Sequence, residues 1–286
     1  MAVYKRTYVP YEGPRTPAWS RFLILPRVSY GRLWNSKFLV MFFMACFFYP
    51  LGLTAYVYVA NNLSILEQFQ QAAARYVTVD ASVFLYYCSF QGAAAYLLTA
   101  FVGPSLISPD LVNGALPLYL GRPFSRVEYL LGKMSVLVIL LSTITWIPGL
   151  IVFGIQGSLA GGTWTKDNLF IAGALVAGIM LWIIVLSLIA LAVSAWVKWK
   201  VAAGAVLMGV FFAGAGFGGA VNAVLRTQNG YLLNIRQVIY TVWAGLFDTD
   251  PDNGLSLQNA WMVLSVVVAA CLWLLLRRVR AFEVVK

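Results

Sequence analysis

The sequence contains no histidine, and only 10% of its 286 residues are charged. Because histidine is the usual general base near neutral pH and the commonest metal ligand, its absence disfavours most hydrolytic and metal-dependent enzymes. The three cysteines, Cys46, Cys88 and Cys271, lie singly in apolar runs and do not have the spacing of metal ligands. Asp248, Asp250 and Asp252 alternate as in a calcium-binding loop, but the terminal glutamate of such a loop is missing. We therefore expect no metal site.

A nucleotide-binding motif is also lacking. Gly132 and Lys133 resemble the end of a phosphate-binding loop, but that loop needs a further glycine where Val127 stands. Met134 occupies the position of its serine or threonine. The chain is therefore not expected to bind ATP itself.

What the sequence has in abundance is apolar surface. Hydrophobic residues make up 61% of the chain and the mean hydropathy is +0.81, more than the core of a soluble globule could hide. We expect an all-α integral membrane protein with six transmembrane helices and no second soluble domain. The expected spans cover residues 38–60, 81–107, 134–156, 169–197, 201–222 and 260–276. Prolines at 50, 104 and 148 free backbone groups that need partners on neighbouring helices, so the spans should form a packed bundle.

The basic residues predict how the bundle is oriented. Of the 20 lysines and arginines, 16 fall in the two tails and in the two loops on the same side as the tails. By the positive-inside rule both termini are expected in the cytoplasm, in a multi-pass protein of a prokaryotic inner membrane. A seventh span would place the C-terminal arginines outside. Orientation also explains the net charge of +10 better than nucleic-acid binding does.

Two further segments are expected to lie at the membrane without crossing it. Residues 1–37 form a basic tail in which Pro17 to Ser36, with its tryptophans, suits an interfacial elbow helix on membrane lipid, broken at Pro26. The alternative is a solvated basic tail. Residues 223–259 hold an apolar stretch of about 17 residues, near the lower limit for a crossing. We expect a re-entrant or interfacial helical segment on the outer face there.

The fifth span is rich in glycine. Gly214 and Gly218 have the spacing that lets two helices approach closely. They are expected to form a helix-packing contact.

A polar loop, residues 108–133, separates the second and third spans. Ser108 and Asp110 are typical of a helix start, which predicts a short amphipathic helix over residues 108–120. Ser125 and Glu128 have the spacing of a capping box and predict the start of the next helix. A sharply turned, charged loop of this kind favours a docking surface.

The loop resembles the signature of ABC-2-type transporter permeases. The matching elements are Asp110, residues 114–120, Arg122-Pro123-Phe124-Ser125-Arg126, Tyr129 and Gly132-Lys133. The resemblance implies a coupling helix docked on a separate cytoplasmic ABC ATPase, which binds the ATP and magnesium, and a second permease, identical or homologous. It assigns the coupling contact to Ser108, Asp110, Asn113, Leu116, Tyr119, Arg122, Pro123, Ser125, Arg126, Glu128 and Lys133. A second, smaller cytoplasmic contact is expected at Lys198 and Lys200.

The expected function is therefore that of the transmembrane subunit of an ATP-driven exporter without its own cofactor. The expected spans lack ionisable residues away from their ends, which disfavours a proton or ion relay. Most polar residues there should bond neighbouring helices, and a minority are candidates for the path of a lipophilic substrate: Tyr86, Phe90, Gln91, Trp146 and Asn222. Two alternatives remain, a non-transporting scaffold or sensor subunit and, less favoured, an intramembrane enzyme.

Overall fold

The computed structural model describes residues 20, 23–62, 78–115 and 125–278, and these are helical, with no strand among them. Six helical segments in these ranges are long and apolar enough to cross a membrane. They are Lys37–Ala60, Ala81–Val112, Arg126–Ala160, Leu169–Trp196, Lys200–Leu225 and Leu257–Arg278. The prediction of an all-helical fold with six helices able to span a membrane is thereby confirmed for the described part of the chain.

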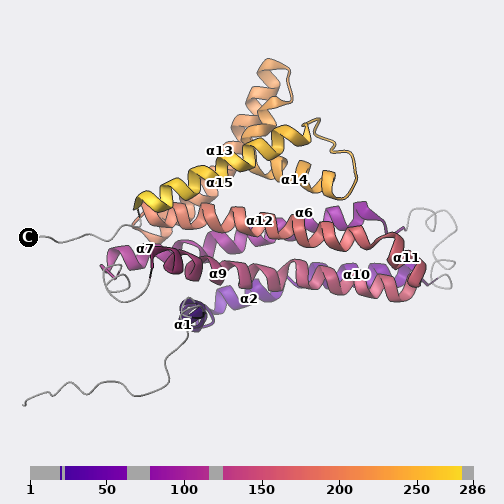
Figure 1. The fold of residues 1–286 in the computed structure, drawn as a ribbon, viewed down its shortest axis with the longest axis horizontal. Helices are drawn as coiled ribbons and strands as arrows, with labels where there is room; N and C mark the ends of the chain where they lie inside the picture. Colours follow the sequence, from indigo (N-terminus) through magenta and orange to yellow (C-terminus); the bar gives the residue numbers. More distant parts are fainter. Residues whose placement is uncertain (1–19, 21–22, 63–77, 116–124, 279–286) are drawn as a thin grey trace, which may run out of the picture.

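Several spans are composed of two helices, and shorter helices lie between them (Figure 1). In chain order the elements are α1 (Ile24–Leu33), α2 (Lys37–Ala45), α3 (Phe48–Ala60), α6 (Ala81–Val102), α7 (Pro104–Val112), α9 (Arg126–Ile144), α10 (Trp146–Ala160), α11 (Gly162–Asp167), α12 (Leu169–Trp196), α13 (Lys200–Leu225), the 3₁₀ helix η2 (Asn229–Leu233), α14 (Ile235–Leu246) and α15 (Leu257–Arg278).

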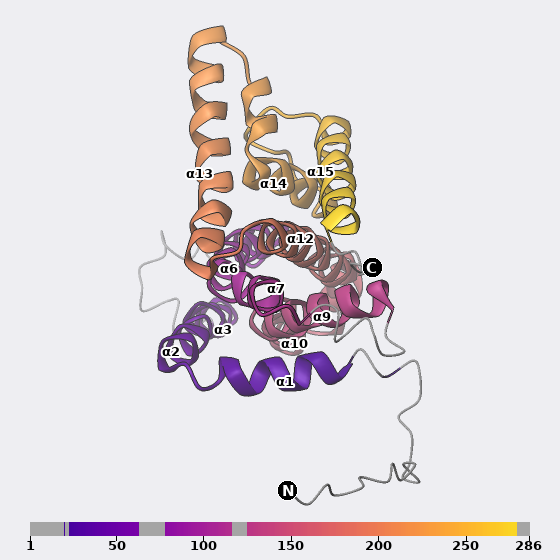
Figure 2. The same ribbon diagram turned by 90° about the vertical axis from the view of Figure 1, so that its left-hand side faces the viewer.

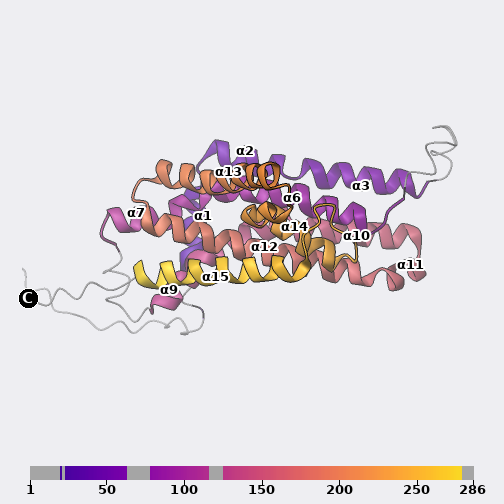
Figure 3. The same ribbon diagram turned by 90° about the horizontal axis from the view of Figure 1, so that it is seen from above.

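The centre of the bundle is α12, which contacts α6, α7, α9, α10, α13, α14 and α15. It carries the most apolar window of the six spans, and two thirds of that window is buried. Helices α9 and α10 follow one another end to end along the long axis, beside α6 and α12 (Figures 1 and 3). Seen along that axis, α13 leaves the bundle at a steep angle, with α14 between it and α15 (Figure 2).

Two proline breaks share one buried partner. Pro50 and Pro148 cannot donate to the carbonyls four residues earlier, which belong to Cys46 and Ile144. Gln91 Nε2 on α6 donates to both of these carbonyls, at 3.0 Å from that of Cys46. The Gln91 side chain is fully buried. The expected need for neighbouring partners is therefore met, and Gln91, one of the candidates for a substrate path, bonds other helices inside the bundle.

The N-terminal elbow is helical where it is described, but it is not broken at Pro26. Helix α1 begins at Ile24 and runs through this proline. Backbone N–H groups in the first turn of a helix have no acceptor within the helix, so a proline there removes no hydrogen bond. The helix crosses the bundle almost at right angles (Figure 2). Tyr30 fastens it there by donating from its hydroxyl to the Val136 carbonyl on α9 at 2.7 Å.

The segment between the last two spans folds back against the bundle. Helix α13 continues to Leu225 and ends at Arg226, whose φ is 48°. The following α14 has 12 residues, about 18 Å of helix, which is too short to cross a hydrocarbon layer of about 30 Å. Asn253 fixes the next loop to α14 by donating to Thr241 Oγ1 at 2.9 Å.

Gly214 and Gly218 permit a close approach, although not to another span. A Cβ atom on either would lie 2.5 Å from a backbone oxygen, that of Leu233 or Gly230, both on η2. The predicted packing contact is therefore real, but its partner is the 3₁₀ helix that follows α13.

We predict that Gln91→Met lowers the stability of the folded protein by about 2 kcal/mol, because two buried carbonyls lose their donors. Gln91→Glu should cost more, since a carboxylate has no donor to offer. Ser89→Ala is the matched control, because this hydroxyl bonds only the Leu85 carbonyl of its own helix. Unfolding of the purified variants in detergent measures the effect, and wild-type stability of Gln91→Met would contradict it.

Candidate functional site

The polar loop begins later than the sequence predicts. Helix α7 starts at Pro104, so Ser108 lies inside it and is not an N-cap, and Asp110 stands near its end and not in a first turn. The helix stops at Val112 because Gly114 adopts a φ of 61°. Ala115 N then donates to the Asp110 carbonyl at 2.8 Å, which completes a Schellman motif. Of the helix expected over residues 108–120, residues 108–112 are helical, but they belong to a helix that starts at Pro104 and ends before Gly114; residues 116–120 lie outside the described residues.

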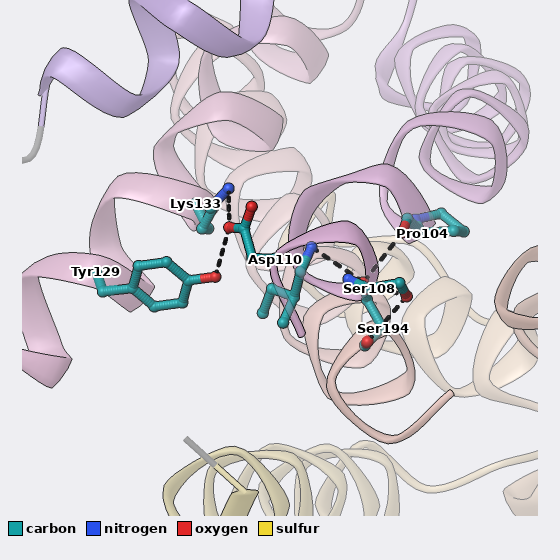
Figure 4. A network of polar contacts seen from close by, with 7 residues as sticks. Pro104, Ser108, Asp110, Tyr129, Lys133 and Ser194 are labelled. Carbon is teal, nitrogen blue, oxygen red and sulfur yellow. Dashed lines mark hydrogen bonds and ion pairs between the residues drawn. The ribbon is translucent and has the colours of Figure 1, made fainter. Parts of the chain in front are cut away.

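Ser108 instead fastens α7 to α12 through Ser194 (Figure 4). Ser194 Oγ accepts from the backbone N–H groups of Ile107 and Ser108, at 3.2 and 2.9 Å, and donates to the Pro104 carbonyl. Ser108 Oγ lies 2.9 Å from the Ser194 carbonyl and 2.8 Å from that of Val197. Ser194 is one of the polar span residues expected to bond a neighbouring helix, but the sequence does not reveal which helix a serine in an apolar span faces.

Asp110 joins α7 to α9. Its Oδ2 atom lies 2.7 Å from Lys133 Nζ and accepts from the Tyr129 hydroxyl at 2.8 Å (Figure 4). Tyr129 and Lys133 are four residues apart on one helix, so both side chains reach the same face. We call these three residues the clamp.

The clamp is a buried charge pair in which each charged group has a partner. The side chains of Lys133 and Asp110 are 7% and 12% exposed. A carboxylate near the C-terminal end of a helix meets the negative end of the helix dipole, so Asp110 depends on its two partners. Losing one partner of such a pair costs about 3–5 kcal/mol. The clamp therefore holds the two ends of the polar loop together.

The far end of the loop has the expected cap. Ser125 Oγ accepts from Glu128 N at 3.1 Å, and Glu128 Oε2 accepts from Ser125 N at 2.6 Å, so the capping box is confirmed. Helix α9 thus starts at Arg126, eight residues before the expected span, and Arg126 is exposed. Asn113 is an exposed C-cap of α7. Four predicted contact residues lie outside the described residues: Leu116, Tyr119, Arg122 and Pro123.

The same end of the bundle carries the second predicted contact. Lys198 in the turn between α12 and α13 and Lys200 at the first position of α13 are both exposed, and they follow the Val197 carbonyl that Ser108 bonds. Arg278 Nε from α15 donates to the Ala195 carbonyl at 3.3 Å. The structure thus gathers basic residues from four elements around the clamped loop.

The candidate substrate path is only partly supported. A cavity of about 710 Å³ lies between α6, α13 and α14, and Tyr86 lines it. Phe90 stacks on Tyr49 outside this cavity, with ring centroids 4.1 Å apart. Trp146 starts α10 elsewhere, and Asn222 accepts from Gly230 N at 2.7 Å.

Aromatic residues form much of the cavity wall, among them Trp182 and two that the sequence did not single out, Phe211 and Trp243. Tyr240 also lines it, and burial and then the charge of Asp252 raise the pKa of its hydroxyl. Their signal in the sequence was weak, because aromatic residues are frequent in every span.

A double-mutant cycle tests the clamp. We predict that Lys133→Met and Asp110→Asn each destabilise the protein by about 3 kcal/mol, whereas the double variant costs clearly less than the sum. The reason is that each single change strands a buried partner. Unfolding in detergent gives the four stabilities, and strict additivity would show that the pair does not interact.

Tyr129→Phe provides a finer test of the same site. It removes one hydrogen bond to Asp110 and keeps the ring, so a loss of about 1–2 kcal/mol is expected. The matched control is Tyr56→Phe, whose hydroxyl bonds an exposed backbone carbonyl of Thr78. Equal effects of the two changes in the same unfolding assay would contradict the buried geometry.

Comparison of the chain with protein-family models finds no match, and comparison with curated proteins finds no significant relative. The likeness of residues 108–133 to a permease signature therefore stays a prediction from the residues themselves.

Proposed function

We propose that this chain is the membrane-spanning permease subunit of an ATP-driven exporter, with ATP hydrolysed by a separate cytoplasmic subunit. The observation that carries the proposal is the clamp of Asp110, Tyr129 and Lys133 at the two ends of the polar loop. A loop that served only as a tether would need no buried ion pair at its base. A loop that receives mechanical force does need one.

The geometry suggests how such force would travel. A push on the loop reaches α7 through Asp110 and α9 through Lys133, and it reaches α12 through the bonds of Ser108 with Ser194. These helices form the centre of the bundle. Packed helices move as rigid bodies, so a shift of the loop would tilt three spans together. Opening of a substrate cavity on the opposite side would follow.

The charges support an orientation for this proposal. The starts of α9 and α13 and the end of α15, which carry Arg126, Lys200 and Arg278, lie at the loop's end of the bundle, and Lys198 precedes α13. Helix α11, which carries Lys166, lies at the other end (Figure 1). By the positive-inside rule the loop faces the cytoplasm, where an ATPase would reach it. A second permease, identical or homologous, would complete the transporter, and magnesium and ATP would belong to the partner. Helix α1, which crosses the bundle at this end, would lie on the cytoplasmic lipid headgroups.

A scaffold or sensor subunit is the second candidate. It would use the same loop to dock a partner, and the clamp would serve it equally well. The cavity favours the transporter, because a scaffold has no need of an aromatic-lined space of about 710 Å³.

We predict that the tagged chain, purified in mild detergent from its natural cells, recovers an ATPase subunit, and that Arg126→Glu reduces this recovery roughly tenfold. Arg126 is exposed at the first turn of α9, where an acidic residue suits the helix dipole, so folding should persist. Lys166→Glu is the matched control, because it reverses one exposed lysine at the opposite end. Mass spectrometry and ATPase assay provide the measurement.

Two outcomes would count against the proposal. Recovery of membrane proteins without any ATPase would favour the scaffold. An equal effect of both charge reversals would show that the clamped loop is not the docking surface.

A further inference from the structure

The cavity between α6, α13 and α14 has the size of a small-molecule site. Its volume of about 710 Å³ lies within the range of roughly 300–1,000 Å³ typical of such sites. It arises because α13 stays beside α6 only along its first half. Tyr96 on α6 contacts the Met208 carbonyl at 3.3 Å and stacks near Phe211, with ring centroids 4.3 Å apart. Beyond these contacts, Gly214 and Gly218 of α13 pack against η2, and α13 diverges from α6.

The inner wall of the cavity is apolar and rigid. Trp182 and Trp243 meet edge to face, with ring centroids 6.1 Å apart. Their indole N–H groups donate to the Gly92 and Gly178 carbonyls at 2.9 and 2.8 Å. Because the backbone carbonyls already accept from both indole N–H groups, the two rings present only apolar surface to the cavity. Such a wall suits an alkyl chain or another apolar body.

The polar wall lies at the start of α14 and in the loop after it. Gln237 and Asn253 bond each other there, with Asn253 Nδ2 at 3.2 Å from Gln237 Oε1. Arg236 lines the same wall, and none of the described carboxylates lies within 4.0 Å of its guanidinium. It stands in the first turn of a 12-residue helix, where the helix dipole adds positive potential. Asp252 lines the cavity as well, but at the start of α14 the charge of Arg236 and the helix dipole both favour a negatively charged group.

The rim of the cavity is reached from outside the bundle. Tyr86 on α6 and Phe212 on α13 line it and are 60% and 70% exposed. Both belong to candidate spans, whose outer surfaces face lipid in a membrane. A membrane-dissolved molecule therefore has lateral access.

We propose that this cavity binds an amphiphile with an apolar chain and an anionic head group, the chain lying between α6 and α13 and the head group at Arg236. That this amphiphile is the exported molecule rests on the proposed function. Its binding does not, and it can be tested without any ATPase.

The experiment uses the full chain in nanodiscs of zwitterionic lipid, with two photoactivatable probes of equal chain length. One is a diazirine fatty acid, which is anionic, and the other is the corresponding uncharged monoacylglycerol. We expect cross-links at Tyr86, Tyr96 or Phe212, located by mass spectrometry, with tighter binding of the fatty acid. A diazirine phosphatidylglycerol then shows whether a two-chain lipid supplies the same chemistry.

Variants separate the contributions of charge and space. Arg236→Gln should weaken binding of the anionic probe about tenfold, the loss expected for one charge-assisted hydrogen bond, and leave the neutral probe unchanged. Arg236→Lys should restore most of the affinity, and Asp252→Asn should not weaken it. Ala215→Trp fills the cavity and should abolish labelling by both probes. Ala213→Trp is its control, an exposed position on the same helix that does not line the cavity.

Two results would overturn the proposal. Labelling that persists in Ala215→Trp, or that maps away from the cavity, means that the probes merely coat the membrane surface. A loss of affinity in Asp252→Asn but not in Arg236→Gln means that the head group is cationic. Specific labelling of the cavity in a chain that recovers no ATPase would instead contradict the proposed exporter function and support the binding site.

Discussion

The controlling constraint in this protein is that backbone carbonyls inside a membrane have no water to bond. The chain breaks its own helices, and at those breaks the side chains of other helices supply the missing donors. Gln91 serves the two carbonyls that Pro50 and Pro148 leave free. Between α9 and α10, Tyr87 donates to the Thr145 carbonyl at 2.6 Å, in addition to Gly149 N at 3.2 Å. Because each such bond joins two spans, the breaks tie the bundle together.

Charge obeys the same constraint. Apart from the clamp and the half-buried Glu128 of the capping box, the charged residues named above on described helices are exposed, so they remain in polar surroundings. The clamp takes one cation and one anion into the interior together, each with a hydrogen-bonded or ionic partner. A buried pair of this kind adds little net stability compared with apolar packing, but it cannot be broken cheaply. A buried pair of this kind therefore suits a site whose geometry must stay fixed, such as the base of the polar loop.

The steep course of α13 connects the fold with the proposed binding site. Its glycines let it contact η2 so closely that α14 is held between α13 and the central helix α12. The space left beside α6 is the cavity, bounded by aromatic rings on one side and by Arg236 on the other. Loop clamp and cavity lie on helices that share α12 as a neighbour. A displacement of the clamp would therefore be transmitted to the cavity through the packing of these helices on α12.

The sequence alone determined that the chain has six apolar helices, that a capping box starts α9 at Ser125, and that proline-freed carbonyls need outside partners, since these depend on composition and local spacing. It could not determine that α7 begins at Pro104, because start signals at Ser108 and Asp110 match those of a true N-terminus. Only tertiary structure decided that Ser194 accepts the N–H of Ser108, that Lys133 meets Asp110, and that Gly214 faces η2. These contacts join residues far apart in the chain, whose proximity follows from three-dimensional packing and leaves no local pattern.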